Sequence, residues 1–87
     1  MVFSQISRLF YSMIKSLNLH GIKHQDAFRE VDKFIGESML KGFDEVHIVT
    51  GMSDDMKAIV YSVLEDYGVT CEEDWWNKGK LIIDLTW

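Results

Sequence analysis

Hydrophobic residues along this chain repeat with two different periods, and the segments with the shorter period predict strands. Residues 16–20 alternate leucine with a polar residue, as a strand with one buried face does, and Gly21 ends the alternation. Residues 45–50 also alternate between two faces, and Gly51 follows directly. The pattern predicts two short strands, each ended by a glycine.

Two longer segments carry apolar residues at the three- and four-residue spacing of amphipathic helices. These segments are residues 27–39 and residues 56–67. Ser53 or Asp54 suits the N-cap of the second helix, and Gly68 suits the left-handed position that ends it.

The tail contains two β-prone runs, residues 69–75 and 81–87, around a turn at 77–79. Gly79 is predicted to take the positive φ of a bulged hairpin turn. The complete element order is β-α-β-α-β-β, which predicts an α/β two-layer sandwich with a mixed four-stranded sheet.

Residues 1–15 form a separate amphipathic segment in front of one domain at 16–87. Apolar residues at 3–14 follow a helical stripe, although residues 9–14 also suit an extended run into the next strand. Two helices pack on only one side of such a sheet, so we expect this segment to cover part of the open face.

The composition restricts the cellular compartment and the kinds of partner that this chain is expected to have. Lys and Arg number 9 against 14 Asp and Glu, a net charge of -5, so a nucleic-acid site on this chain has to be local. A single cysteine, Cys71, forms no internal disulfide, which favours a reducing cytoplasm. No apolar run approaches the roughly 20 residues of a membrane span, so no membrane partner is expected.

The element order also predicts where a ligand binds. Two strands joined by one helix are expected to be parallel, so His20-Gly21 and Thr50-Gly51 end at the same edge of the sheet. Ligands of open α/β sheets gather outside the carboxyl ends of strands. Strand alternation adds Asn18 and His47 to the open face, which predicts a polar cluster there.

These residues resemble a known family. The run Leu17-Asn18-Leu19-His20-Gly21 is similar to the Leu-Asp-Leu-His-Gly that opens the Smr (small MutS-related) domain family. Residues 46–53 resemble its second motif, a strand ending in His-Gly-x-Gly or Thr-Gly-x-Gly, and Met56-Lys57 resembles the apolar-basic pair that opens the next helix. The resemblance covers residues 16–87.

The resemblance implies a fold similar to the C-terminal domain of translation initiation factor three. It also implies DNA or RNA binding, often with endonuclease activity. His20 would then transfer protons and Asn18 would orient it or the attacking water, while Thr50, Gly51, Lys57 and Lys23 would position the phosphodiester. The alternatives are structural: a strand-end histidine that bonds its turn, an ordinary strand-to-helix turn, and solvated lysines.

Three departures from the family pattern leave open whether the domain is an enzyme. Asn18 replaces an aspartate, and an amide accepts no proton at neutral pH. Ser53 replaces the second glycine of the second motif, which restricts the backbone. Asp54 and Asp55 suit the helix dipole but repel a phosphate.

The spacing of the potential metal ligands gives little support for a metal site. The candidates are His20, His24, His47, Asp54 and Asp55, and they fit no closed zinc pattern. Weak magnesium binding is the most that they suggest, so no metal ligand is predicted and the cofactor, if any, stays unknown.

Adjacent tryptophans suggest a contact surface. Trp75 and Trp76 are expected to lie on a strand, one facing the core and the other facing outward, where a ring could stack on a base or contact a protein. Trp87 adds a third. The preceding acidic run, residues 72–74, favours a protein partner, so the second hypothesis is a catalytically inactive Smr-fold interaction module.

Overall fold

The computed structural model describes residues 15–86, and the order of their elements confirms the predicted order. The elements are β1 (Lys15–Asn18), α2 (His24–Leu40), β2 (Glu45–Val49), α3 (Asp54–Tyr67), β3 (Thr70–Glu73) and β4 (Lys80–Asp84). The expectations for residues 1–14 and for Trp87 lie outside the described residues. Neither helix in the described part of the chain has the length and apolar character needed to cross a membrane.

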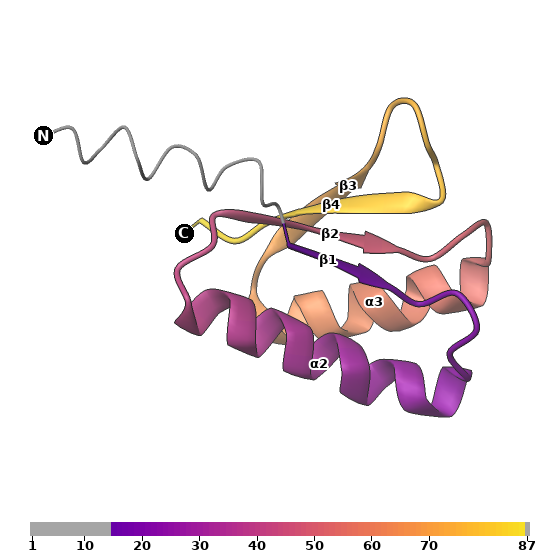
Figure 1. Cartoon of the computed structure of the whole chain (residues 1–87), viewed down its shortest axis with the longest axis horizontal. Coiled ribbons are helices and arrows are strands. Elements are labelled where there is room, and N and C mark those ends of the chain that lie inside the picture. The colour runs from indigo at the N-terminus through magenta and orange to yellow at the C-terminus, as the bar shows by residue number, and fades with distance from the viewer. Residues whose placement is uncertain (1–14, 87) are drawn as a thin grey trace, which may run out of the picture.

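The four strands form one mixed sheet in the order β1-β2-β4-β3. β1 and β2 are parallel, whereas β4 runs antiparallel to both β2 and β3. Both helices lie on one face of this sheet, as Figure 1 shows. The predicted two-layer α/β sandwich is confirmed, and the described residues place no helix on the other face.

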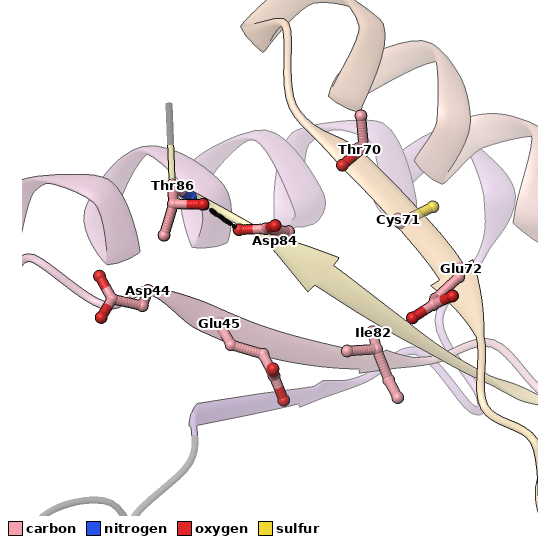
Figure 2. A pocket seen from close by; sticks show the side chains of 8 residues that line it. All are labelled: Asp44, Glu45, Thr70, Cys71, Glu72, Ile82, Asp84 and Thr86. Atoms are coloured by element: carbon pink, nitrogen blue, oxygen red, sulfur yellow. Dashed lines mark hydrogen bonds between the residues drawn. The ribbon is translucent and has the colours of Figure 1, made fainter.

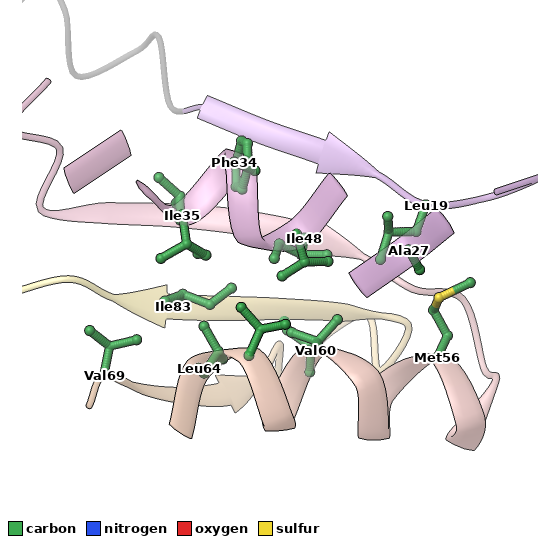
Figure 3. Close-up of a cluster of buried hydrophobic side chains, with 14 of the residues drawn as sticks. Leu19, Ala27, Phe34, Ile35, Ile48, Met56, Val60, Leu64, Val69 and Ile83 are labelled. Carbon is green, nitrogen blue, oxygen red and sulfur yellow. The ribbon is translucent and has the colours of Figure 1, made fainter. Parts of the chain in front are cut away.

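The core lies between the two helices and the sheet (Figure 3). α2 and α3 each contribute apolar residues from one stripe and β2 contributes alternate residues, as predicted. β4 also contributes alternate residues. Full burial of each such side chain stabilises the fold by roughly 1.5–3 kcal/mol. The largest completely buried apolar residues are Leu19, Val31, Ile35, Val46, Ile48, Val60, Val63, Leu81 and Ile83.

Both ends of α3 are formed by the capping residues that the sequence predicts. The Ser53 hydroxyl oxygen accepts a hydrogen bond from the Met56 N–H at 3.1 Å, so Ser53 is the N-cap. Gly68 ends the helix at φ 72°, and the next amide, that of Val69, donates to the Leu64 carbonyl at 3.2 Å. Val69 is thereby turned into the core.

The hairpin strands are shorter than predicted, and the two tryptophans do not alternate across them. β3 ends at Glu73, where the Asp74 carboxylate accepts the Trp76 N–H at 2.9 Å and starts a turn. Trp75 and Trp76 therefore lie in the loop, 80% and 89% exposed. The expectation of one buried ring and one exposed ring is wrong, because it assumed that the strand continued to Trp75.

Gly79 serves a different purpose from the predicted one, because it does not adopt a positive φ. It is buried against the β2–α3 turn, where an added Cβ would lie 3.0 Å from the Cα of Gly51. Its carbonyl accepts hydrogen bonds from the Thr50 and Gly51 amides at 2.8 and 3.0 Å. The Thr50 hydroxyl lies 3.3 Å from the same oxygen. Glycine is needed here for close approach of two backbones.

An ion pair joins α3 to β3 on the helix side of the sheet. The Lys57 ammonium donates to the Glu73 carboxylate at 2.9 Å, with the Lys57 side chain 10% exposed and that of Glu73 40% exposed. This hydrogen bond lowers the pKa of Glu73 and raises that of Lys57. The pair fixes the edge strand against the helix layer.

We expect Gly79→Ala to destabilise the domain by about 1–3 kcal/mol, because the new methyl group forces two backbones apart. Urea denaturation followed by circular dichroism measures the change. Lys78→Ala, at the neighbouring exposed position, is the control and should leave the free energy of unfolding within about 0.5 kcal/mol of the wild type. Equal stability of Gly79→Ala and the control would contradict the close approach.

Glu73→Gln should remove part of the acid sensitivity of folding. Because the pKa of Glu73 is lowered in the folded state, its ionisation stabilises the fold above the unfolded value of roughly 4.3, and this contribution is lost as the pH falls through the folded value. The stability difference between wild type and variant should be largest at pH 7 and shrink below about pH 4. Glu72→Gln is the matched control; a gap independent of pH would refute the role of ionisation.

Candidate nucleic-acid interface

Two parallel strands bring their carboxyl ends together at one edge of the sheet. Asn18 is in register with Val49, and the Leu19 amide donates to the Val49 carbonyl at 2.9 Å, so the pairing continues past the end of β1. Each strand then enters a turn through a left-handed glycine, Gly21 at φ 86° and Gly51 at φ 70°. Both turns lie at the same end of the molecule in Figure 1. The predicted adjacency of the two strand ends is confirmed.

His20 occupies the first of these turns, with its side chain exposed. Its backbone N–H donates to the Asn18 side-chain oxygen at 2.8 Å, which closes a turn of the kind that Asn and Asp both form. No ion pair or hydrogen bond within residues 15–86 engages the imidazole ring. The ring is accessible to a ligand at this edge.

Asn18 lies on the open face of the sheet, two residues along β1 from the register position of His47. Since neighbouring strands in register point their side chains the same way, Asn18 and His47 share that face, as expected. However, the His47 ring is paired with the Glu45 carboxylate at 2.9 Å and is 15% exposed. His47 is thus drawn toward the beginning of β2 and away from His20.

The Thr50-Gly51 turn lies beside His20 but directs its polar groups into the protein. Thr50 is 6% exposed, and its hydroxyl donates to the Gly51 carbonyl at 2.9 Å. Both amides of the turn donate to Gly79, as described above. The direct contact of these groups with a phosphate stays a prediction, while in the structure Thr50 and Gly51 shape the edge and hold the hairpin there.

Of the two lysines expected at the site, one is buried and one is exposed. The Lys57 ammonium is held by Glu73, so a phosphate contact of Lys57, which stays a prediction, would compete with this ion pair. Lys23 is exposed at the N-cap position of α2, directly after the His20 turn. The Lys23 side chain is therefore accessible to a ligand, and its contact with a phosphate stays a prediction.

The start of α3 explains one departure from the family pattern. Ser53, which stands where the second motif has a glycine, is the N-cap and uses its hydroxyl for Met56. Asp54 and Asp55 are exposed in the first turn of the helix, where they complement its dipole. Within residues 15–86, no three His, Cys, Asp or Glu side chains are grouped so that they could hold a metal ion.

The hairpin tip, residues 74–79, is a part of this edge that the sequence did not reveal. Because Gly79 is bonded to Thr50 and Gly51, the tip stands at the same end of the molecule as the two strand ends (Figure 1). It carries the exposed rings of Trp75 and Trp76 together with exposed Lys78. The turn at residues 77–79 was predicted from the sequence, but no local sequence pattern indicates a contact between residues 51 and 79.

The opposite end of the open face is acidic. An open hollow of about 490 Å³ lies between the start of β2 and the strands β3 and β4. Figure 2 shows the side chains that line it. The Asp84 carboxylate there accepts hydrogen bonds from the Thr86 hydroxyl at 2.6 Å and the Thr86 amide at 2.9 Å, which lower its pKa. The other acidic residues of this acidic hollow are Asp44, Glu45 and Glu72.

Comparison with known proteins supports the resemblance read from the two motifs. The model of the Smr domain matches residues 17–70, a stretch that runs from β1 into the first residue of β3 and includes both strand ends. Neither the curated proteins nor the solved structures gave a match to this chain. Since the matched stretch is more than half of the 87 residues, the chain belongs to the Smr domain family.

Proposed function

We propose that this domain binds DNA or RNA at the paired ends of β1 and β2 and cleaves a phosphodiester bond there through His20. Membership of the Smr domain family assigns the chain, at family level, to nucleic-acid-binding or endonuclease-like proteins. The observation that carries the finer proposal is the exposed His20 ring beside the glycine turn that follows β2. We name this region, residues 18–23 with residues 50 and 51, the strand-end site.

An imidazole can supply the proton transfers of phosphodiester cleavage near neutral pH. In the proposed step, His20 removes a proton from the attacking hydroxyl or water as its oxygen forms a bond to phosphorus. The bond from phosphorus to the leaving oxygen breaks, and the imidazolium returns the proton to that oxygen. In this proposed step the proton taken from the attacking oxygen is the one given to the leaving oxygen, so the protons balance.

Asn18 supports this step through the backbone. Its side-chain oxygen holds the His20 amide at 2.8 Å, and that bond requires only an acceptor, which an amide and a carboxylate both provide. What the amide lacks is a negative charge that would stabilise an imidazolium nearby. We therefore propose a positioning role for Asn18 and a slow reaction.

The exposed lysine next to the His20 turn is proposed to contact the phosphate backbone. Lys23 supplies a positive charge at the edge where Asp54 and Asp55 supply negative ones, so binding is expected to be local and weak. Thr50 and Gly51 contribute by fixing the shape of the turn.

A cytoplasmic location is proposed with this function. Cys71 is a free, half-buried thiol, and burial together with Glu72 and Glu73 raises its pKa, which keeps it protonated and unreactive. A chain without an internal disulfide among its described residues suits a reducing compartment.

The role of His20 is tested by single-turnover cleavage of labelled structured RNA and DNA. His20→Ala should reduce the cleavage rate by roughly 10²-fold or more, because the proton-transfer group is lost. Asn18→Asp should keep the turn and raise the rate, because it places a negative charge near the ring.

His24→Ala is the matched control, since His24 is an exposed imidazole four residues further on, in the first turn of α2. It should cleave at the wild-type rate. Equal rates in His20→Ala and His24→Ala preparations would show that any cleavage comes from a contaminant or from another site.

Binding is tested separately from cleavage by its dependence on salt. Lys23→Ala should weaken binding to all sequences alike and reduce the slope of log affinity against log salt by about 1. Lys41→Ala removes the same charge at the far end of α2 and should leave both quantities unchanged. If the two variants bind alike, the phosphate contact at Lys23 is refuted.

A second candidate function is protein binding without catalysis, and the acidic hollow favours it. Four carboxylates border one depression of the open face, which suits a basic segment of a protein. Trp75 and Trp76 were expected to serve such a partner, but the hairpin tip stands at the other end of the face. Absence of nucleic-acid binding at low salt by a correctly folded protein would favour this second function.

A further inference from the structure

Two tryptophan rings at the hairpin tip keep most of their surface in water. Trp75 is 80% exposed and Trp76 is 89% exposed, and their ring centroids lie 6.4 Å apart with an angle of 84° between the planes. Burial of a tryptophan side chain removes on the order of 150–250 Å² of its surface from contact with water. Neither ring of the tip is buried, so neither contributes this stabilisation to the fold. An edge-to-face pair also leaves ring faces that the partner ring does not cover. Such faces suit a flat aromatic ligand.

The loop that carries these rings is held by hydrogen bonds from both sides. The Asp74 carboxylate accepts the Trp76 amide and the Asn77 side-chain oxygen accepts the Gly79 amide, each at 2.9 Å. The Asp74 amide donates to the Lys80 carbonyl at 2.9 Å. A held loop loses less conformational entropy when it binds a ligand.

The same loop is fastened to the strand-end site. The Gly79 carbonyl receives the amides of Thr50 and Gly51, and an added Cβ on Gly79 would meet the Gly51 backbone. A ligand whose backbone lies at the strand-end site therefore passes close to the tip.

The acidic run before the tryptophans is largely neutralised by internal pairs. Glu73 is bonded to Lys57, and Asp74 lies 3.3 Å from the Lys80 ammonium, with side chains 16% and 28% exposed. Lys78 stays exposed and lines, with both rings and the two paired carboxylates Glu73 and Asp74, an open hollow of about 480 Å³. The tip thus presents two aromatic rings and a cation, a combination that suits a base attached to a phosphate.

We propose that Trp75 and Trp76 stack on an unpaired base of the nucleic acid bound at the strand-end site. This inference rests on the proposed function and names its substrate class. Bases inside a duplex are covered by their neighbours, so a base that reaches the tip comes from a single strand, a loop, a bulge or a frayed end. Cleavage is then directed to phosphodiester bonds next to unpaired nucleotides.

The test compares two labelled oligonucleotides, an unstructured single strand and a blunt duplex, in fluorescence anisotropy titrations with the full chain. Trp75→Ala and Trp76→Ala should each weaken binding of the single strand about 5- to 150-fold, the range of one lost stacking contact. Binding of the duplex should change less than about twofold, and the salt slope for the single strand should stay at its wild-type value because no charge is removed. Trp76→Phe should restore most of the affinity.

Tyr61→Ala is the matched control, because Tyr61 is an aromatic residue of α3 that is 43% exposed and distant from the tip in sequence. It should bind both oligonucleotides as the wild type does. Wild-type binding of the single strand by both tryptophan variants, while Lys23→Ala still weakens it, would overturn the stacking inference alone.

Two further outcomes would also reject the inference. Failure of the wild type to bind either oligonucleotide at low salt would reject the proposed function together with this extension of it. A tip used for self-association would appear in size-exclusion chromatography as a dimer that Trp75→Ala dissociates.

Discussion

The carbonyl oxygen of Gly79 is the point on which the arrangement of the strand-end site depends. It lies within hydrogen-bonding distance of three donors, all from Thr50 and Gly51, and no other residue type fits between the two backbones without a shift. Residues 29 positions apart are thereby locked together. The turn after β2, the hairpin tip and, through the parallel pairing of β1, the His20 turn become one rigid edge.

The layered fold also separates the open face into two chemically different ends. The helices of residues 15–86 both cover the same side of the sheet, so Asn18, His47 and the acidic hollow lie on the other side. The hydrogen bond between His47 and Glu45 lies between these ends and directs the imidazole toward the acidic one. As a result the molecule has an aromatic end of mixed charge at the strand carboxyl termini and an acidic end where β2 begins.

Local rules accounted for most of the fold. The order of elements, the Ser53 cap and the Gly68 stop could be predicted, because each depends on residues near one another in the chain. The parallel pairing followed from the single helix that joins β1 to β2. The site was predictable only in part. The adjacency of His20 and Gly51 followed from topology, whereas the burial of Lys57 depends on a glutamate 16 positions away.

The two failures at the hairpin have different physical causes, one a contact between distant residues and the other a local turn. Gly79 was assigned a turn conformation and Trp75 a strand position from their neighbours alone, but a contact with residue 51 and an early turn at Asp74 decided both. A glycine needed for close approach and a glycine needed for a positive φ look alike in a sequence. Only the partner backbone distinguishes them.

The amide of Asn18 has a consequence for how the domain behaves in acid. A carboxamide neither gains nor loses a proton over the range in which imidazoles and carboxylates change charge. The bond from its oxygen to the His20 amide therefore keeps its acceptor when the medium is acidified. An aspartate in the same place would lose its negative charge on protonation, which would weaken this hydrogen bond. With asparagine, the hydrogen bond that closes the His20 turn does not depend on pH in this way.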